Sequence, residues 1–237
     1  MVARKIKLLF CDIFKEEIQI LDPPQEQYDI EYLACGLHYH PAKLHLEIQE
    51  ALNRSSGYSR VVIGFGLCGG SLTGIKAPDS SLVIPLVHDC LPVLLGSKAK
   101  YQELQHKENR TFYFSGGWVE GERMLIHEYE RSCIKFGPKK ALRIFRMMFE
   151  NYTRMMYIHT GHPRDNNSLV RTRAFAGIFD LPCLETHGNL DYLKKLVFGP
   201  WDTNEFITVP AYGMVKEDEF LTDGEGIIVQ GGGIGWL

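Results

Sequence analysis

Short runs of apolar residues alternate along the chain with longer segments whose apolar residues recur at helical spacing. The short runs predict eight β-strands, over residues 5–10, 29–34, 60–66, 82–87, 111–114, 155–159, 183–186 and 206–209. The longer segments predict helices over residues 41–53, 120–136, 139–152, 167–179 and 189–198. This alternation is typical of a mostly parallel sheet covered by helices, so we expect a doubly wound, Rossmann-like α/β fold.

No repeat, low-complexity tract or Pro/Gly/Ser-rich linker divides the 237 residues. We therefore expect a single α/β domain over residues 1–237. A candidate sub-division lies near Gly137, between a half rich in Cys and His (1–137) and a sparser half (138–237). The glycine-rich segment 223–237 is interpreted as a terminal strand followed by a loop.

The composition of the chain limits the kinds of binding partner that we expect. A formal net charge of −3 gives no basic excess for nucleic acid or an anionic membrane. No signal peptide and no transmembrane segment is expected, because the apolar runs are short and the first one contains Cys11 and Asp12. Six cysteines without a CxxC pair do not indicate a disulfide framework, so we expect a cytoplasmic protein with free or metal-bound thiols.

Soft metal ligands follow several of the predicted strands. Cys11 comes after the first strand, Cys68 after the third, and His88 and Cys90 after the fourth. Because ligands of doubly wound sheets bind outside the carboxyl ends of the strands, these side chains are expected to share one edge. Two thiolates and an imidazole suit Zn²⁺ and leave a fourth position open.

The candidate metal ligands are therefore Cys68, His88 and Cys90, with Cys11 as a further ligand. His88 and Cys90 would point to the same side if their segment were extended. The alternative is that a cysteine at a strand end is a small buried apolar residue, which we prefer for Cys35, Cys133 and Cys183. Cys133 lies in a helical segment and has no obvious partner. Both interpretations stay open for Cys11.

Other residues at the same edge are candidates for catalysis or cofactor binding. His38 is a candidate catalytic residue, or it hydrogen-bonds near the start of the following helix. Asp89 would orient a ligating imidazole, or cap the turn that follows. Gly66 and Gly69 would clear space for a cofactor, and Trp118 would stack on a planar ligand or belong to the core.

The glycines also match a dinucleotide-binding pattern. Gly64, Gly66 and Gly69 satisfy G-x-G-x-x-G after a predicted strand. The pattern should open directly into a helix, whereas residues 71–81 lack helical periodicity and contain Pro78. We therefore do not expect a nicotinamide or flavin cofactor here.

Several stretches together resemble an uncharacterised family, the domain of unknown function 1638. They are residues 36–44 (GLHYHPAKL), 64–70 (GFGLCGG), 87–97 (VHDCLPVLLGS), 113–118 (YFSGGW), 152–161 (YTRMMYIHTG) and 188–202 (GNLDYLKKLVFGPWD). The resemblance puts His38, Cys68, His88 and Cys90 on motif positions, while His40 departs from the asparagine expected there. It further implies a setting beside corrinoid-dependent methyltransferases of anaerobic microorganisms.

Three functions are compatible with these residues. The first is a Zn-dependent enzyme of one-carbon metabolism that transfers a methyl group or a thiol on a small-molecule substrate. The second is a [4Fe–4S] protein in which Cys11, Cys68 and Cys90 hold the cluster and leave one iron open. The third is a non-catalytic corrinoid-binding or accessory module for a methyltransferase partner, although the Asp-x-His-x-x-Gly corrinoid signature is absent.

Overall fold

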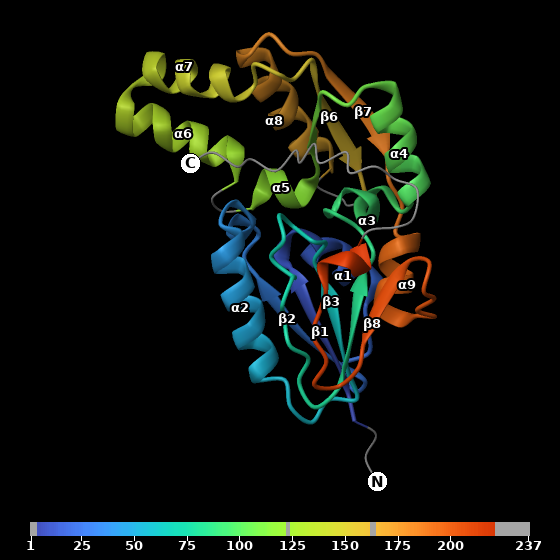
Figure 1. The fold of residues 1–237 in the computed structure, drawn as a ribbon. Helices are drawn as coiled ribbons and strands as arrows, with labels where there is room; N and C mark the ends of the chain where they lie inside the picture. The colour runs from blue at the N-terminus through green and yellow to red at the C-terminus, as the bar shows by residue number, and fades with distance from the viewer. Residues whose placement is uncertain (1–3, 122–123, 162–164, 221–237) are drawn as a thin grey trace.

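The computed structural model describes residues 4–121, 124–161 and 165–220. The glycine-rich segment 223–237, for which a terminal strand was predicted, lies outside these residues. The described chain forms a mixed α/β structure with two sheets (Figure 1). We call the part built on the five-stranded sheet the first lobe and the part built on the three-stranded sheet the second lobe.

The five-stranded sheet has the order β2-β1-β3-β4-β8. Its strands are β1 (Ile6–Cys11), β2 (Tyr28–Leu33), β3 (Arg60–Gly64), β4 (Ser81–Pro85) and β8 (Phe206–Val209). The first four run parallel, and β8 pairs antiparallel with β4. Central strands with long apolar runs, such as Val61–Ile63 in β3, are covered on both faces, as parallel sheets require.

The second sheet is parallel and has the order β5-β6-β7. Its strands are β5 (Thr111–Phe114), β6 (Arg154–His159) and β7 (Cys183–His187). Alternate residues divide between two cores, because successive side chains of a strand point to opposite faces. Met155 and Tyr157 pack into the second-lobe core, whereas Met156 and Ile158 join the first-lobe core. The lobes are therefore joined by apolar packing.

Helices surround both sheets. They are α1 (Lys15–Leu21), α2 (Pro41–Asn53), α3 (Leu91–Leu95), α4 (Lys98–Lys107), α5 (Gly116–Glu120), α6 (Leu125–Phe136), α7 (Pro138–Met148), α8 (Asp165–Ile178) and α9 (Asp191–Phe198). Short 3₁₀ turns η1 (Asp12–Phe14), η2 (Cys35–Tyr39) and η3 (Glu217–Phe220) complete the described elements. No described helix is both long and apolar enough to cross a bilayer.

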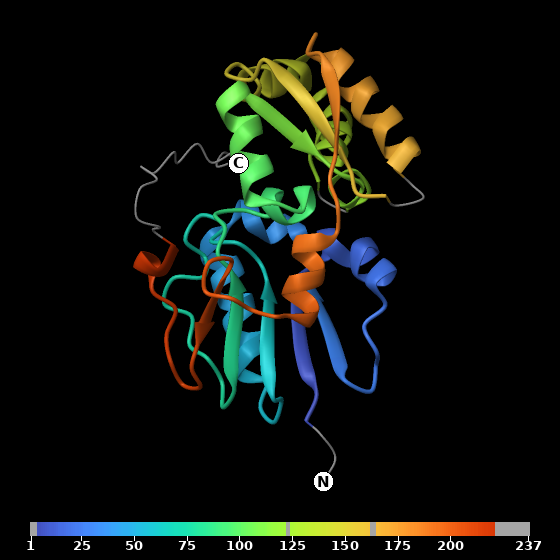
Figure 2. The same ribbon diagram turned by 90° about the vertical axis from the view of Figure 1, so that its right-hand side faces the viewer.

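The chain crosses between the lobes twice, after β4 and after β7, and α9 and β8 return to the first lobe (Figures 1 and 2). Gly137 thus lies within the second lobe, between α6 and α7. The carboxyl ends of β1, β3 and β4 point toward the second lobe (Figure 1). In a doubly wound sheet this edge is the one that carries the ligand site.

The predicted α/β fold is confirmed. Each predicted strand is present, with ends that differ by no more than two residues, and the five predicted helices are found as α2 and α6 to α9. No helix follows the G-x-G-x-x-G pattern, since residues 71–80 form turns and a single bridge at Lys76. The structural context of a dinucleotide fingerprint is therefore missing, as expected.

Candidate thiol site at the lobe junction

Three cysteines lie where neighbouring strands of the first sheet end at the junction of the lobes. Cys11 is the last residue of β1, Cys68 lies in the loop after β3, and Cys90 precedes α3 after β4. Strands β1, β3 and β4 are consecutive in the sheet. Cys11 is buried, whereas Cys68 and Cys90 are half-buried.

These thiols are close enough to affect one another electrostatically. Burial raises the pKa of the Cys90 thiol well above its ordinary value, and the charges of Asp89, Cys68 and Cys11 raise it further. Burial likewise raises the pKa of Cys11, with Cys35, Asp12 and Cys68 adding to it. The pKa of Cys68 rises to about 12 through burial and the neighbouring Asp89. At neutral pH the three thiols are therefore protonated.

Asp89 lies beside two of the thiols and is itself in a buried setting. Its Oδ1 accepts a hydrogen bond from the amide of Leu91, the first residue of α3, at 2.9 Å, and the Tyr101 hydroxyl donates to Oδ2 at 3.4 Å. Burial raises the pKa of the Asp89 carboxyl. It also raises the pKa of Tyr101, and Asp89 adds to this shift, so the tyrosine stays a donor.

The loop that carries Cys68 is held against the loop that carries His88 and Asp89. The Cys68 amide donates to the His88 carbonyl at 2.9 Å, and Cys68 adopts a left-handed backbone with φ of 44°. A Cβ at Gly66 would lie 2.9 Å from the Asp89 backbone, so only glycine allows this approach. Left-handed geometry costs a non-glycine residue about 1–2 kcal/mol. The fold thus stores strain at the thiol.

The two histidines expected at the site differ from the thiols in their surroundings. His88 is exposed, and the segment 88–90 bends, with Cys90 in helical backbone conformation, so the extended geometry assumed for His88 and Cys90 is not found. His38 donates from Nδ1 to the carbonyl of Cys35 at 2.5 Å, within its own 3₁₀ turn. Burial lowers the pKa of His38. Among the described residues, no group of three or more His, Cys, Asp or Glu side chains is arranged to hold a metal ion.

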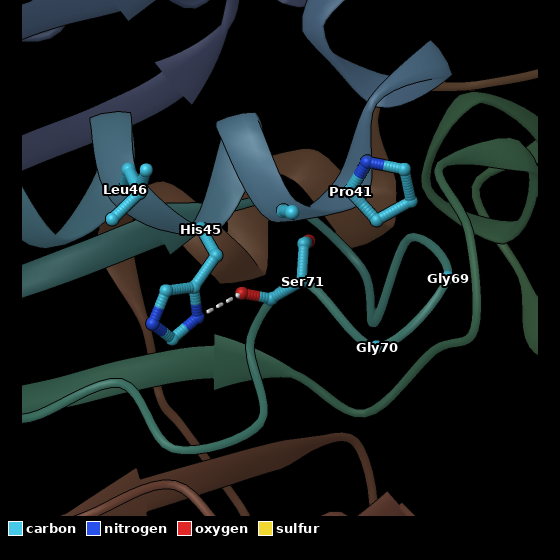
Figure 3. Close-up of a pocket in the computed structure, with 7 residues that line it drawn as sticks. Pro41, His45, Leu46, Gly69, Gly70 and Ser71 are labelled. Atoms are coloured by element: carbon cyan, nitrogen blue, oxygen red, sulfur yellow. Dashed lines mark hydrogen bonds between the residues drawn. The ribbon is translucent and has the colours of Figure 1, made fainter.

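A pocket of about 440 Å³ adjoins the Cys68 loop (Figure 3). It lies between the start of α2 and the glycines that follow Cys68, and its walls include Pro41, Gly69 and Ser71. His45 closes one side by donating from Nδ1 to the Ser71 carbonyl at 3.0 Å. Gly69 has φ of +69° and would place a Cβ 3.1 Å from the Pro41 ring, which accounts for this glycine without a cofactor.

Trp118 lies in α5, on the second lobe, and packs half-buried against the first-lobe core. Gly117 makes this contact close, because a Cβ there would lie 2.2 Å from the Ile13 carbonyl oxygen of the first lobe. Cys35 is buried in η2, just after β2; its amide donates to Asp12 Oδ1 at 2.7 Å, and its thiol lies 3.2 Å from the Met124 sulfur. Cys133 lies in α6 and Cys183 in β7, so neither belongs to the junction.

A second polar group at the junction was not predicted from the sequence. Glu17 of α1 is 1% exposed and accepts a 2.8 Å hydrogen bond through Oε1 from the Thr160 hydroxyl, which follows β6 in the second lobe. Asp165 accepts from the Thr160 amide at 3.1 Å and from the Tyr157 hydroxyl at 2.9 Å. Burial raises the pKa of Glu17 to about 7, even though the Thr160 hydrogen bond lowers it.

The fold and the site thus define a two-lobed α/β protein with thiols gathered at the carboxyl edge of its main sheet. The chain belongs to the family described as "Protein of unknown function (DUF1638)", whose model matches residues 32–197. No curated protein and no solved structure matches it.

Proposed function

We propose that Cys11, Cys68 and Cys90 form a soft-metal thiolate centre. The observation that carries the proposal is their common position at the ends of three consecutive strands, where neighbouring thiols of the set raise the pKa of Cys11 and of Cys90. Three thiolates without a cation would repel one another in this buried setting. A bound metal cation would offset that repulsion and so favour ionisation of the three thiols.

The three-cysteine set is better supported than the Cys68–His88–Cys90 set. His88 is exposed, whereas Cys11 is buried and lowers the tendency of Cys90 to ionise. Thiolate ligands suit Zn²⁺ and iron–sulfur clusters alike. Metal binding requires the three thiols to release their protons and to approach one another, because the described side chains do not already form a metal-binding group.

The reaction class that we propose is methyl or thiol transfer on a small-molecule substrate, in the one-carbon, corrinoid-linked setting that the family resemblance implies. A zinc–thiolate centre would supply a Lewis acid that lowers the pKa of an incoming thiol. In this chain, Asp89 would set the electrostatics of Cys68 and Cys90, and the pocket beside Gly69 and Gly70 would admit the substrate.

The test is anaerobic purification followed by determination of Zn, Fe, Co and sulfide per chain. It compares wild type with Cys11→Ala, Cys68→Ala and Cys90→Ala, and uses Cys133→Ala and Cys183→Ala as matched controls outside the junction. About one Zn per chain, lost from the three junction variants and kept in the controls, is expected for a zinc–thiolate centre.

Brown protein with about four Fe and four sulfide per chain, lost from the same three variants, would make the centre an iron–sulfur cluster. Cobalt in place of both would favour the accessory corrinoid-binding module. If wild type takes up none of these metals even after reconstitution under reducing conditions, the metal-thiolate proposal is wrong.

A further inference from the structure

The hairpin formed by α6 and α7 is unusual in charge. Residues 131–149 contain six Lys or Arg and neither Asp nor Glu. The rest of the chain keeps 20 basic and 29 acidic residues, a formal net charge of −9. Within the described chain, Lys135, Lys139, Lys140 and Arg143 make no ion pair, whereas Arg146 pairs with Asp180 at 2.9 Å. Arg131 is paired with Glu128 of α6, so the unneutralised positive charge lies on the part of the hairpin that follows it.

Large apolar side chains are exposed on the same hairpin. Ile134 of α6 is 87% exposed and Met147 of α7 67% exposed, although the buried Ala141 and Phe145 show that α7 has another face for the core. The ammonium groups of Lys135 and Lys140 lie 4.9 and 5.1 Å from the centre of the Phe136 ring. We call residues 134–147 the basic tip. Exposed apolar side chains surrounded by charge mark a contact surface.

A surface of the opposite charge and similar apolar character lies on the first lobe. After β8, Tyr212 is 79% and Met214 49% exposed, and Glu217 and Asp218 of η3 are exposed next to them. Lys216 is the basic residue of this stretch. We call residues 212–219 the acidic edge. Glu217 and Asp218 make no ion pair with other described residues.

The two surfaces complement each other but belong to different lobes of one molecule (Figure 1). No hydrogen bond or ion pair joins residues 134–147 to residues 212–219 in the described chain. We propose that the basic tip of one copy docks on the acidic edge of a second copy. Opposite charges orient the encounter, and the exposed apolar side chains supply the buried area.

This contact is heterologous, since it joins two different surfaces of the same chain. Tip-to-tip pairing is disfavoured because it would bring the unneutralised cations of two hairpins together. A heterologous contact leaves a free tip and a free edge on every dimer, so association continues to a ring or an open chain. The proposal is independent of the metal centre, which lies at the lobe junction.

Sedimentation velocity over micromolar to submillimolar protein, at low and high salt, tests the proposal. Wild type is expected to self-associate with concentration, and more weakly at high salt because the charges are screened. Charge reversal of the tip (Lys139→Glu with Lys140→Glu) or of the edge (Glu217→Lys with Asp218→Lys) is expected to give monomers. An equimolar mixture of the two variants restores complementary surfaces and should associate again.

Two further variants separate the contact from general charge effects. Lys43→Glu with Glu50→Lys reverses exposed charges on α2 and should leave self-association unchanged. Ile134→Ser removes an exposed apolar side chain and should weaken association about tenfold without affecting the fold. A wild type that stays monomeric, or a mixture that fails to associate, overturns the proposal. So does a monomeric wild type that instead binds phosphatidylglycerol vesicles through Lys139 and Lys140, because the tip would then be a membrane surface.

Discussion

Glu17 shows how a single buried carboxyl at the lobe junction couples stability to pH. Its Oε1 accepts from Thr160, whereas Oε2 is buried and has no hydrogen-bond partner among the described residues. Burial is the largest cause of its pKa of about 7, against an ordinary value of 4.5. The folded state therefore holds a proton between these two pH values that the unfolded state releases.

We expect the free energy of unfolding to fall as pH rises from 4.5 to about 7, and to level off above that, because Glu17 must ionise in a buried position. The penalty above neutral pH is up to about 3 kcal/mol. Glu17→Gln keeps an acceptor for Thr160 and cannot ionise, so its stability should exceed that of wild type most clearly above neutral pH. Urea unfolding across this pH range measures the free energy of unfolding, with the exposed Glu50→Gln as control. A Glu17→Gln variant that keeps the wild-type slope would assign the pH dependence to other groups.

At the scale of elements, α7 is held by one aromatic face. Phe145 is 3% exposed and packs against Tyr129 of α6, with ring centroids 5.1 Å apart, and against Phe179 at 6.4 Å. The opposite side of the helix carries the exposed Met147 and unpaired cations. Amphipathic helices of this kind take their stability from tertiary packing rather than from intrinsic propensity.

Phe145→Ala is expected to lower the free energy of unfolding by about 3–5 kcal/mol, because it removes a buried ring from the second-lobe core. Met147→Ala on the same helix should change it by less than about 0.5 kcal/mol, since that side chain is largely exposed. Chemical denaturation of both variants gives the comparison. Equal losses for the two would mean that Met147 is covered in solution, as self-association through the basic tip would also cause.

At the scale of the whole molecule, the lobes meet through backbone contacts that exclude a side chain. Besides Gly117 against Ile13, a Cβ at Gly188 would lie 2.0 Å from the Leu94 carbonyl oxygen of α3. Gly117 lies in α5 and Gly188 lies just after β7. They contact two different elements of the first lobe, η1 and α3. The relative position of the lobes, and with it the thiol site, depends on them.

Gly117→Ala and Gly188→Ala should each lower the free energy of unfolding by about 1–3 kcal/mol, because the added methyl group forces the backbones apart. Gly177→Ala in α8 is the matched control, since nothing lies within 4 Å of its Cβ position. It should stabilise the helix by about 0.5–1 kcal/mol. Thermal unfolding of the three variants measures the effect, and an unchanged melting temperature in Gly117→Ala would argue against a rigid junction.

The sequence by itself determined the strands, the main helices and the position of three thiols at strand ends. Periodicity carries this information because a half-buried element must repeat its apolar residues at its own period. Helix α4 was missed because it buries none of its residues and so has no apolar stripe, and α1, α3 and α5 were missed because they have only five to seven residues.

Only the tertiary structure decided which side chains of the two lobes meet at the junction. Glu17 and Thr160 are 143 residues apart, and Glu17 lies outside the stretches singled out in the sequence, so their hydrogen bond follows from how the two lobes pack. The exposure of His88 likewise depends on a loop whose course periodicity does not encode. Local pattern reports what each element buries, whereas burial between elements, and the pKa shifts that it causes, arise only when the lobes meet.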